Sequence, residues 1–185
     1  MQPIPTVAVL STNPALSSLL GATLRRTGKW NIREFRDPRD SAAYMRASIT
    51  SILVCDYDLG TFSAADLAAK IRADASTISR NVQIIALSRS VDADMRAHCV
   101  RAGIDEVVVK PMSPLYLEER VAARMVSGAR RHISALPGYV GPERRERIAL
   151  RDQREVPFER RGDNVISLRA HRLNRQIPGT LRPDA

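Results

Sequence analysis

Three side chains of complementary chemistry each stand at the end of a short apolar run. Asp56 closes the run ILVCD, Ser88 closes IIALS, and Lys110 closes VVVK. A carboxylate can act as a nucleophile or bind a metal, a hydroxyl can donate a hydrogen bond, and an ammonium can offset negative charge. Taken singly, each residue has a commoner role, as a helix cap, a turn residue or a surface lysine. Together they predict one pocket, provided that the three runs are neighbouring strands.

Alternating strands and helices would position these side chains. Short runs rich in β-branched residues predict strands at Thr6–Leu10, Asn31–Phe35, Ser51–Cys55, Val82–Leu87 and Val107–Val109. Segments with helical spacing follow them at Pro14–Thr27, Pro38–Ala47, Ala64–Ala73, Asp92–Ala102 and Pro114–Val126. The run at 31–35 alternates in polarity, as an edge strand does. This order predicts an α/β fold, a doubly wound (βα)5 unit on a five-stranded parallel sheet with its ligand site at the carboxyl edge.

The pattern stops near residue 127, and the charge changes there too. The chain has 185 residues, of which 44% are hydrophobic and 26% charged, and its net charge is +9. Residues 1–126 hold 16 basic and 13 acidic residues, whereas residues 127–185 hold 13 basic and 7 acidic ones. The second part has few large apolar residues with which to form a core. We therefore expect a domain over 1–126 and a basic, Arg-rich, flexible and largely irregular extension over 127–185.

Composition excludes several other classes of protein. The sequence contains no apolar stretch long enough for a membrane helix, and its first residues lack the features of a signal peptide, which favours a cytoplasmic protein. Cys55 and Cys99 lie in apolar segments and are expected to be buried thiols. The histidines at 98, 132 and 171 are too scattered for a zinc site.

Residues 5–126 resemble the receiver domain of two-component response regulators, through the order of elements and the runs ending at Asp56, Ser88 and Lys110. The resemblance implies a flavodoxin-like fold in which Asp56 accepts a phosphoryl group from a histidine kinase. It also implies that Ser88 and Lys110 bind that group, that Mg²⁺ assists, and that the Lys110–Pro111 peptide is cis. A serine or lysine at these places suits such chemistry because both can bind phosphoryl oxygens.

The two residues after the first predicted strand differ from those of the family. Receivers carry two acidic residues there that help to hold Mg²⁺, and this sequence has Ser11 and Thr12. The remaining ligands would be Asp56 and the backbone carbonyl of Asp58, and a hydroxyl supplies no negative charge. We therefore expect weak Mg²⁺ binding, weak or absent phosphorylation at Asp56, and direct pairing between Asp56 and Lys110.

Two further departures concern the surroundings of this pocket. Val107 stands where receivers often have an aromatic switch residue, and Arg89 stands where a small residue is usual. The absent aromatic side chain also argues against a conventional response to phosphorylation. Arg89 is expected to restrict access to the pocket in part.

These features predict an atypical single-domain receiver that is not an enzyme and acts through protein–protein contacts in two-component signalling. The expected partner is a histidine kinase or another signalling protein, or a second copy of the chain. The expected surface combines the helix at 92–102, the strand at 107–109 and the helix at 114–126. Candidate contact residues on it are Met95, Val107, Tyr116 and Glu119. The alternative is a genuine Mg²⁺-dependent phospho-acceptor that catalyses its own phosphoryl transfer.

The extension allows a third interpretation, in which its arginines follow a nucleic-acid backbone. Acidic residues are interleaved with these arginines, which weakens that interpretation. The stretch GYVGPERR, at 138–145, resembles short tails on some stand-alone bacterial receivers. It suggests a docking role for Tyr139 as an aromatic anchor, with Arg144 and Arg145 beside it. The apolar–basic segment Val165–Leu173 predicts one or two helical turns.

Overall fold

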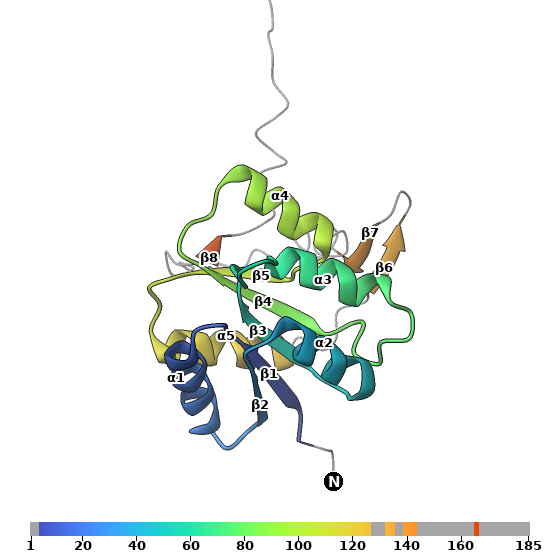
Figure 1. Cartoon of the computed structure of the whole chain (residues 1–185). Coiled ribbons are helices and arrows are strands. Elements are labelled where there is room, and N and C mark those ends of the chain that lie inside the picture. The colour runs from blue at the N-terminus through green and yellow to red at the C-terminus, as the bar shows by residue number, and fades with distance from the viewer. Residues whose placement is uncertain (1–3, 127–131, 136–138, 144–164, 167–185) are drawn as a thin grey trace, which may run out of the picture.

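Five parallel strands form the centre of the molecule (Figure 1). The computed structural model describes residues 4–126, 132–135, 139–143 and 165–166. The parallel strands are β1 Thr6–Leu10, β2 Asn31–Phe35, β3 Ile52–Asp56, β4 Gln83–Ser88 and β5 Glu106–Val109. They lie in the order β2-β1-β3-β4-β5, so that β2 is an edge strand as its alternating pattern predicted. The predicted α/β class and the parallel sheet are confirmed.

Each strand is followed by a helix, and capping hydrogen bonds or a left-handed glycine set several of the helix ends. The helices are α1 Pro14–Arg25, α2 Pro38–Ala47, α3 Ala64–Ala73, α4 Ala93–Ala102 and α5 Pro114–Val126. The Asn13 side chain caps α1 by accepting hydrogen bonds from two backbone amides of its first turn. This helix ends before the predicted Thr27, because the Thr27 hydroxyl donates to the Leu24 carbonyl and closes the turn. Gly103, with φ of 79°, ends α4 in the left-handed conformation.

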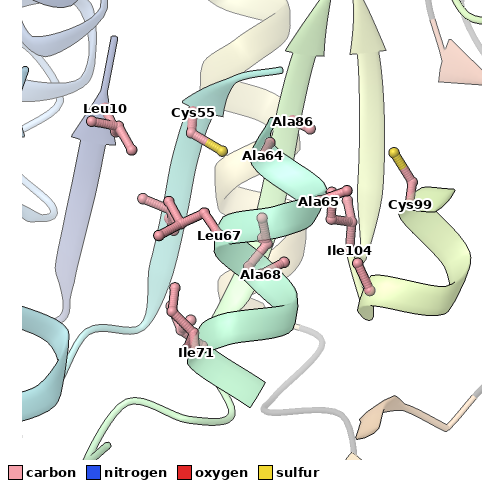
Figure 2. Packing of buried hydrophobic residues seen from close by; sticks show 14 of the residues in the cluster. Leu10, Cys55, Ala64, Ala65, Leu67, Ala68, Ile71, Ala86, Cys99 and Ile104 are labelled. Atoms are coloured by element: carbon pink, nitrogen blue, oxygen red, sulfur yellow. The ribbon is translucent and has the colours of Figure 1, made fainter. Parts of the chain in front are cut away.

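Two apolar layers hold the helices against the sheet. Because successive strand residues point to opposite faces, Val9 and Val54 pack toward α1 and α5, whereas Leu10 and Cys55 pack toward α2, α3 and α4. Figure 2 shows the second layer, where Leu67 of α3 points toward β3. Small residues on α3, namely Ala64, Ala65 and Ala68, are buried and let the helix lie close to the strands. This packing fixes the carboxyl edge on which the predicted pocket lies.

The described parts of the extension are strands. His132–Ala135 (β6) and Tyr139–Pro142 (β7) form an antiparallel pair, and β7 lies beside α3 and α4 (Figure 1). The two residues Val165–Ile166 (β8) pair antiparallel with β5. The prediction of helical turns from 165 is therefore wrong for these two residues, because valine and isoleucine are residue types that favour strands. The rest of that segment, 167–173, lies outside the described residues. The division of the chain at 126/127 stays a prediction.

Within the described residues, no helix is both long enough and apolar enough to cross a membrane.

Candidate functional site

Strand register places Ser11 next to Asp56. Leu10 at the end of β1 is paired with Cys55 of β3, so the residues that follow them, Ser11 and Asp56, are neighbours at the carboxyl edge. Both side chains continue the alternation of Val9 and Val54 and therefore face α1 and α5. Ser11 therefore lies beside the candidate acceptor Asp56 because of the register between β1 and β3.

Both oxygens of the Asp56 carboxylate are engaged. The Ser11 hydroxyl donates to Oδ2 at 2.6 Å, and the Lys110 ammonium donates to Oδ1 at 2.6 Å. Asp56 is only 7% exposed, so these two protein groups replace most of the water that would otherwise solvate the carboxylate. The expected pairing of Asp56 with Lys110 is present.

Ser11 is held in place by contacts of its own. Its amide donates to the Phe35 carbonyl at 3.2 Å, and its hydroxyl oxygen accepts from the Asn13 amide at 3.2 Å. The hydroxyl therefore acts as donor and acceptor at once, which ties the acceptor carboxylate to the start of α1. The sequence identified Ser11 as a missing acid, but the hydrogen bond to Asp56 emerged only from the register of β1 and β3.

Lys110 directly follows β5, and its amide donates to the Ser88 carbonyl at 2.7 Å. This bond continues the β4–β5 ladder by one step and holds the lysine side chain over the sheet edge. The Lys110–Pro111 peptide is cis, as expected.

Ser88, in contrast, is turned away from the carboxylate. Its hydroxyl donates to the Ser90 carbonyl at 2.7 Å, and its oxygen lies 3.8 Å from the sulfur of Met95 on α4. Ser88 continues the alternation of Ala86, which packs on the α3 and α4 side of the sheet. The structure thus brings together Asp56 and Lys110 of the predicted trio, adds Ser11, and directs Ser88 toward α4.

The donors around Asp56 do not fit a hard divalent cation as they stand. Thr12 is exposed, and the exposed Asp58 uses its side chain to accept from the Gly60 amide at 3.0 Å in the following turn. In the described part of the chain, no group of three or more His, Cys, Asp or Glu side chains could hold a metal ion. Mg²⁺ is usually bound through one or two carboxylates, and the Asp56 carboxylate already accepts a hydrogen bond on each of its oxygens.

Cys55 lies next to the candidate acceptor Asp56, and its own thiol is a poor nucleophile. Burial raises the pKa of its thiol, and the neighbouring charge of Asp56 raises it further. The thiol therefore stays protonated at neutral pH, and a protonated thiol is a poor nucleophile.

The expected contact residues are found in different environments. Val107 is 0% exposed and packs on the α3 and α4 side of the sheet, so its side chain is not available to a partner and this expectation is corrected. Tyr116 is half-buried and packs against the apolar layer between the sheet, α1 and α5, and its hydroxyl is buried. Burial also raises the pKa of Tyr116. Glu119 is exposed, and Met95 is half-buried.

The remaining predicted contact residues lie after β4 or in the C-terminal extension. Arg89 directly follows β4 and is exposed, and its expected effect on access to the pocket stays a prediction. Tyr139 begins β7. Arg144 and Arg145 lie outside the described residues, as do the other arginines on which nucleic-acid binding would depend.

The family comparison agrees with this geometry. The sequence profile of the response regulator receiver domain matches residues 7–122. The chain belongs to this family. The receiver domain therefore places the protein in two-component signalling, where such domains are typically signalling modules without enzyme activity and interact with histidine kinases and other signalling proteins.

Solved receivers share the fold at low identity. A putative response regulator from Chloroflexus aurantiacus has 19% identity and a TM-score of 0.58, over 66% of this chain and 98% of that one. The chemotaxis protein CheY4 of Vibrio cholerae has 14% identity and a TM-score of 0.60, over 65% and 98%. A CheY-like receiver protein from Methanospirillum hungatei has 14% identity and a TM-score of 0.61, over 68% and 96%. No curated protein sequence matches this chain.

Proposed function

We propose that this receiver is atypical, that Asp56 is phosphorylated weakly or not at all, and that the protein signals through protein–protein contacts. The observation that carries the proposal is that each Asp56 oxygen accepts a hydrogen bond, one from Ser11 and one from Lys110. Both bonds stabilise the negative charge of the carboxylate and so make it a weaker nucleophile toward phosphorus.

The strength of these hydrogen bonds sets their effect on the rate of phosphorylation. A hydrogen bond to a charged group contributes about 1.5–3 kcal/mol, so weakening one of them as the carboxylate charge moves onto phosphorus would slow the reaction by up to roughly ten- to hundredfold. Ser11 and Thr12 add no negative charge with which to attract a cation to this site. Mg²⁺ is accordingly a cofactor only if Asp56 is phosphorylated, and the unphosphorylated protein needs none.

An apolar groove beside the pocket supports the protein-contact part of the proposal. It runs between α1 and the loop after β5, and its lining includes Leu16, Leu19, Met112 and Lys110. Leu19 is 57% exposed, so the groove presents apolar surface that a partner could bury. A signalling protein seated in this groove, a histidine kinase or another partner, would reach Lys110 and so sense the state of the pocket.

The same pocket supports one alternative, a genuine phospho-acceptor. Asp56 and Lys110 meet in the arrangement that the family resemblance implies for phosphoryl binding. Hydrogen bonds at 2.6 Å are short but reversible, so a strong phosphoryl donor can in principle compete with them. One experiment separates the two functions.

Full-length protein is incubated with acetyl phosphate and Mg²⁺ and followed by phosphate-affinity electrophoresis and intact mass. The control is Asp56→Asn, which keeps the shape of the side chain and removes the nucleophile. We expect at most a trace of phosphorylated protein after a time in which a conventional receiver is fully labelled. A stable band that requires both Mg²⁺ and Asp56 would establish the alternative instead.

A further inference from the structure

The outer edge of β5 is occupied by a segment of the chain's own extension. Val165 lies opposite Val108 and Ile166 lies opposite Val107, in an antiparallel pair. On its other side β5 pairs in parallel with β4. β8 therefore extends the sheet to the order β2-β1-β3-β4-β5-β8, and Figure 1 shows it beside β5.

The two edges of the parallel sheet are protected in different ways. An uncovered edge strand invites pairing with another chain, and charged side chains are a common safeguard. β2 has such charges, because Arg33 is exposed and Glu34 forms an ion pair with Arg25. β5 has one charged residue at its start, Glu106, which pairs with Arg120 and Arg124. The two positions opposite β8 are the uncharged Val107 and Val108, and it is this part of the edge that β8 covers.

The length of the chain permits this cover to come from the same molecule. Twenty-one residues, 144–164, separate Glu143 from Val165. A segment of that length can span up to about 70 Å, which exceeds the roughly 35–40 Å width of a domain of this size. The preceding strand β7 also lies beside α3 and α4.

We propose that Val165–Ile166 is a displaceable cover, bound in cis, that keeps the β5 edge from pairing with a second copy of the chain. Two residues form too short a strand to bind tightly by themselves. Their attachment to the domain supplies a high effective concentration, which makes a weak pairing sufficient. The same weakness lets the cover be displaced, because a modest competing interaction shifts a closely balanced equilibrium.

This cover bears on the surface formed by α4, β5 and α5, where sequence suggested partner or homodimer contacts. With β8 in place, the backbone edge of β5 is closed, and any contact that pairs with it first requires the release of β8. The inference does not depend on whether Asp56 is phosphorylated.

The test uses the full-length chain with Val165→Pro and Ile166→Pro together, because proline lacks the amide hydrogen and cannot continue the ladder. The matched control places the same two prolines in the extension outside β8, at Ile148→Pro and Ala149→Pro. Hydrogen exchange is measured on a peptide covering 104–110 and on one covering β3, whose two neighbours are unchanged. Sedimentation velocity reports the oligomeric state of each protein.

We expect wild type and control to be monomeric with equal exchange. In the 165/166 variant, the outward-facing amides of β5 should exchange at least about tenfold faster, with β3 unchanged. A variant that self-associates and keeps β5 protected also supports the proposal, because the uncovered edge has then passed to a second copy. A monomeric variant with wild-type exchange in β5 overturns it. So does a dimeric wild type that the variant converts to a monomer, because β8 would then pair in trans.

Discussion

The Ser11 hydroxyl donates a 2.6 Å hydrogen bond to Oδ2 of Asp56, at the position where the receiver family carries an acid. A carboxylate at residue 11 would repel Asp56, and the two charges would need a cation between them. A serine removes the repulsion and satisfies one oxygen of Asp56 instead. One substitution thus lowers the demand for Mg²⁺ and stabilises the acceptor in its unreacted form.

Replacing Ser11 with an acid should recreate the demand for a cation. We expect Ser11→Asp with Thr12→Asp to bind Mg²⁺ at least about tenfold more tightly than wild type, since two added carboxylates supply the charge that hard cations require. Isothermal titration with Mg²⁺ measures the change. Ser11→Asn with Thr12→Asn, of similar size but without charge, is the control and should stay near wild type. Equal Mg²⁺ affinity in all three proteins would show that something else blocks the pocket, such as Arg89.

Truncation of the two serines should separate their roles. Ser11→Ala leaves a buried charged oxygen without its donor and should lower the free energy of unfolding by about 1.5–3 kcal/mol. Ser88→Ala removes a bond to a backbone carbonyl at a more exposed site and should cost about 1 kcal/mol or less. Urea denaturation of both variants provides the comparison. If Ser88→Ala proved the more damaging, the hydrogen bond from Ser11 would matter less than its geometry indicates.

The Asp56–Lys110 pair should show energetic coupling. Lys110→Met leaves the buried carboxylate without its counter-charge, whereas Asp56→Asn leaves an ammonium that can turn toward solvent, so the lysine variant should be the less stable of the two. The double variant should be more stable than the two single effects predict, with a coupling energy of about 1–3 kcal/mol. Chemical denaturation of the four proteins completes the cycle. Additive effects would mean that the observed ion pair contributes nothing to stability.

Glu106 should make stability depend on pH. Burial acts to raise the pKa of Glu106, but the hydrogen bonds and charges of Arg120 and Arg124 outweigh it, and the pKa lies below its ordinary value of 4.5. The resulting stability is fully present above 4.5 and is lost as pH falls through the lowered folded-state pKa. Glu106→Gln should therefore cost about 3–5 kcal/mol at neutral pH, and the difference from wild type should shrink as the pH falls below 4.5.

Urea denaturation at pH 7 and at two acidic values tests this dependence. Glu119→Gln is the matched control, because Glu119 precedes Arg120 on α5 but is exposed. Its stability should follow that of wild type at every pH. A difference between Glu106→Gln and wild type that stays constant with pH would contradict the assignment to this carboxylate.

Most of the fold could be predicted from local patterns. The strands Thr6–Leu10 and Asn31–Phe35 and the helices Pro38–Ala47, Ala64–Ala73 and Pro114–Val126 are found at their predicted bounds. Apolar runs and helical spacing are sufficient for this, because each element must bury the same face that its sequence makes apolar. The third strand begins and ends one residue later than predicted, at Ile52–Asp56, since strand ends are set by hydrogen bonds to neighbours.

The residues at the candidate site could be predicted from the sequence, but the orientations of their side chains could not. Spacing placed Asp56, Ser88 and Lys110 at one edge of the sheet, but it did not indicate that the Ser88 hydroxyl turns to the Ser90 carbonyl. Val107 illustrates the same limit. Its place in the sequence suggested a surface contact, yet strand alternation directs its side chain into the core.

The sequence by itself determined the (βα)5 architecture, the candidate acceptor carboxylate and the absence of the two acids after the first strand, because these follow from residue type and local period. Only the tertiary structure decided that Ser11 bonds to Asp56 and that β8 covers β5. Both relationships join residues more than forty positions apart. Their contact depends on strand register and on the path of the chain, and neither is encoded in the neighbourhood of any single residue.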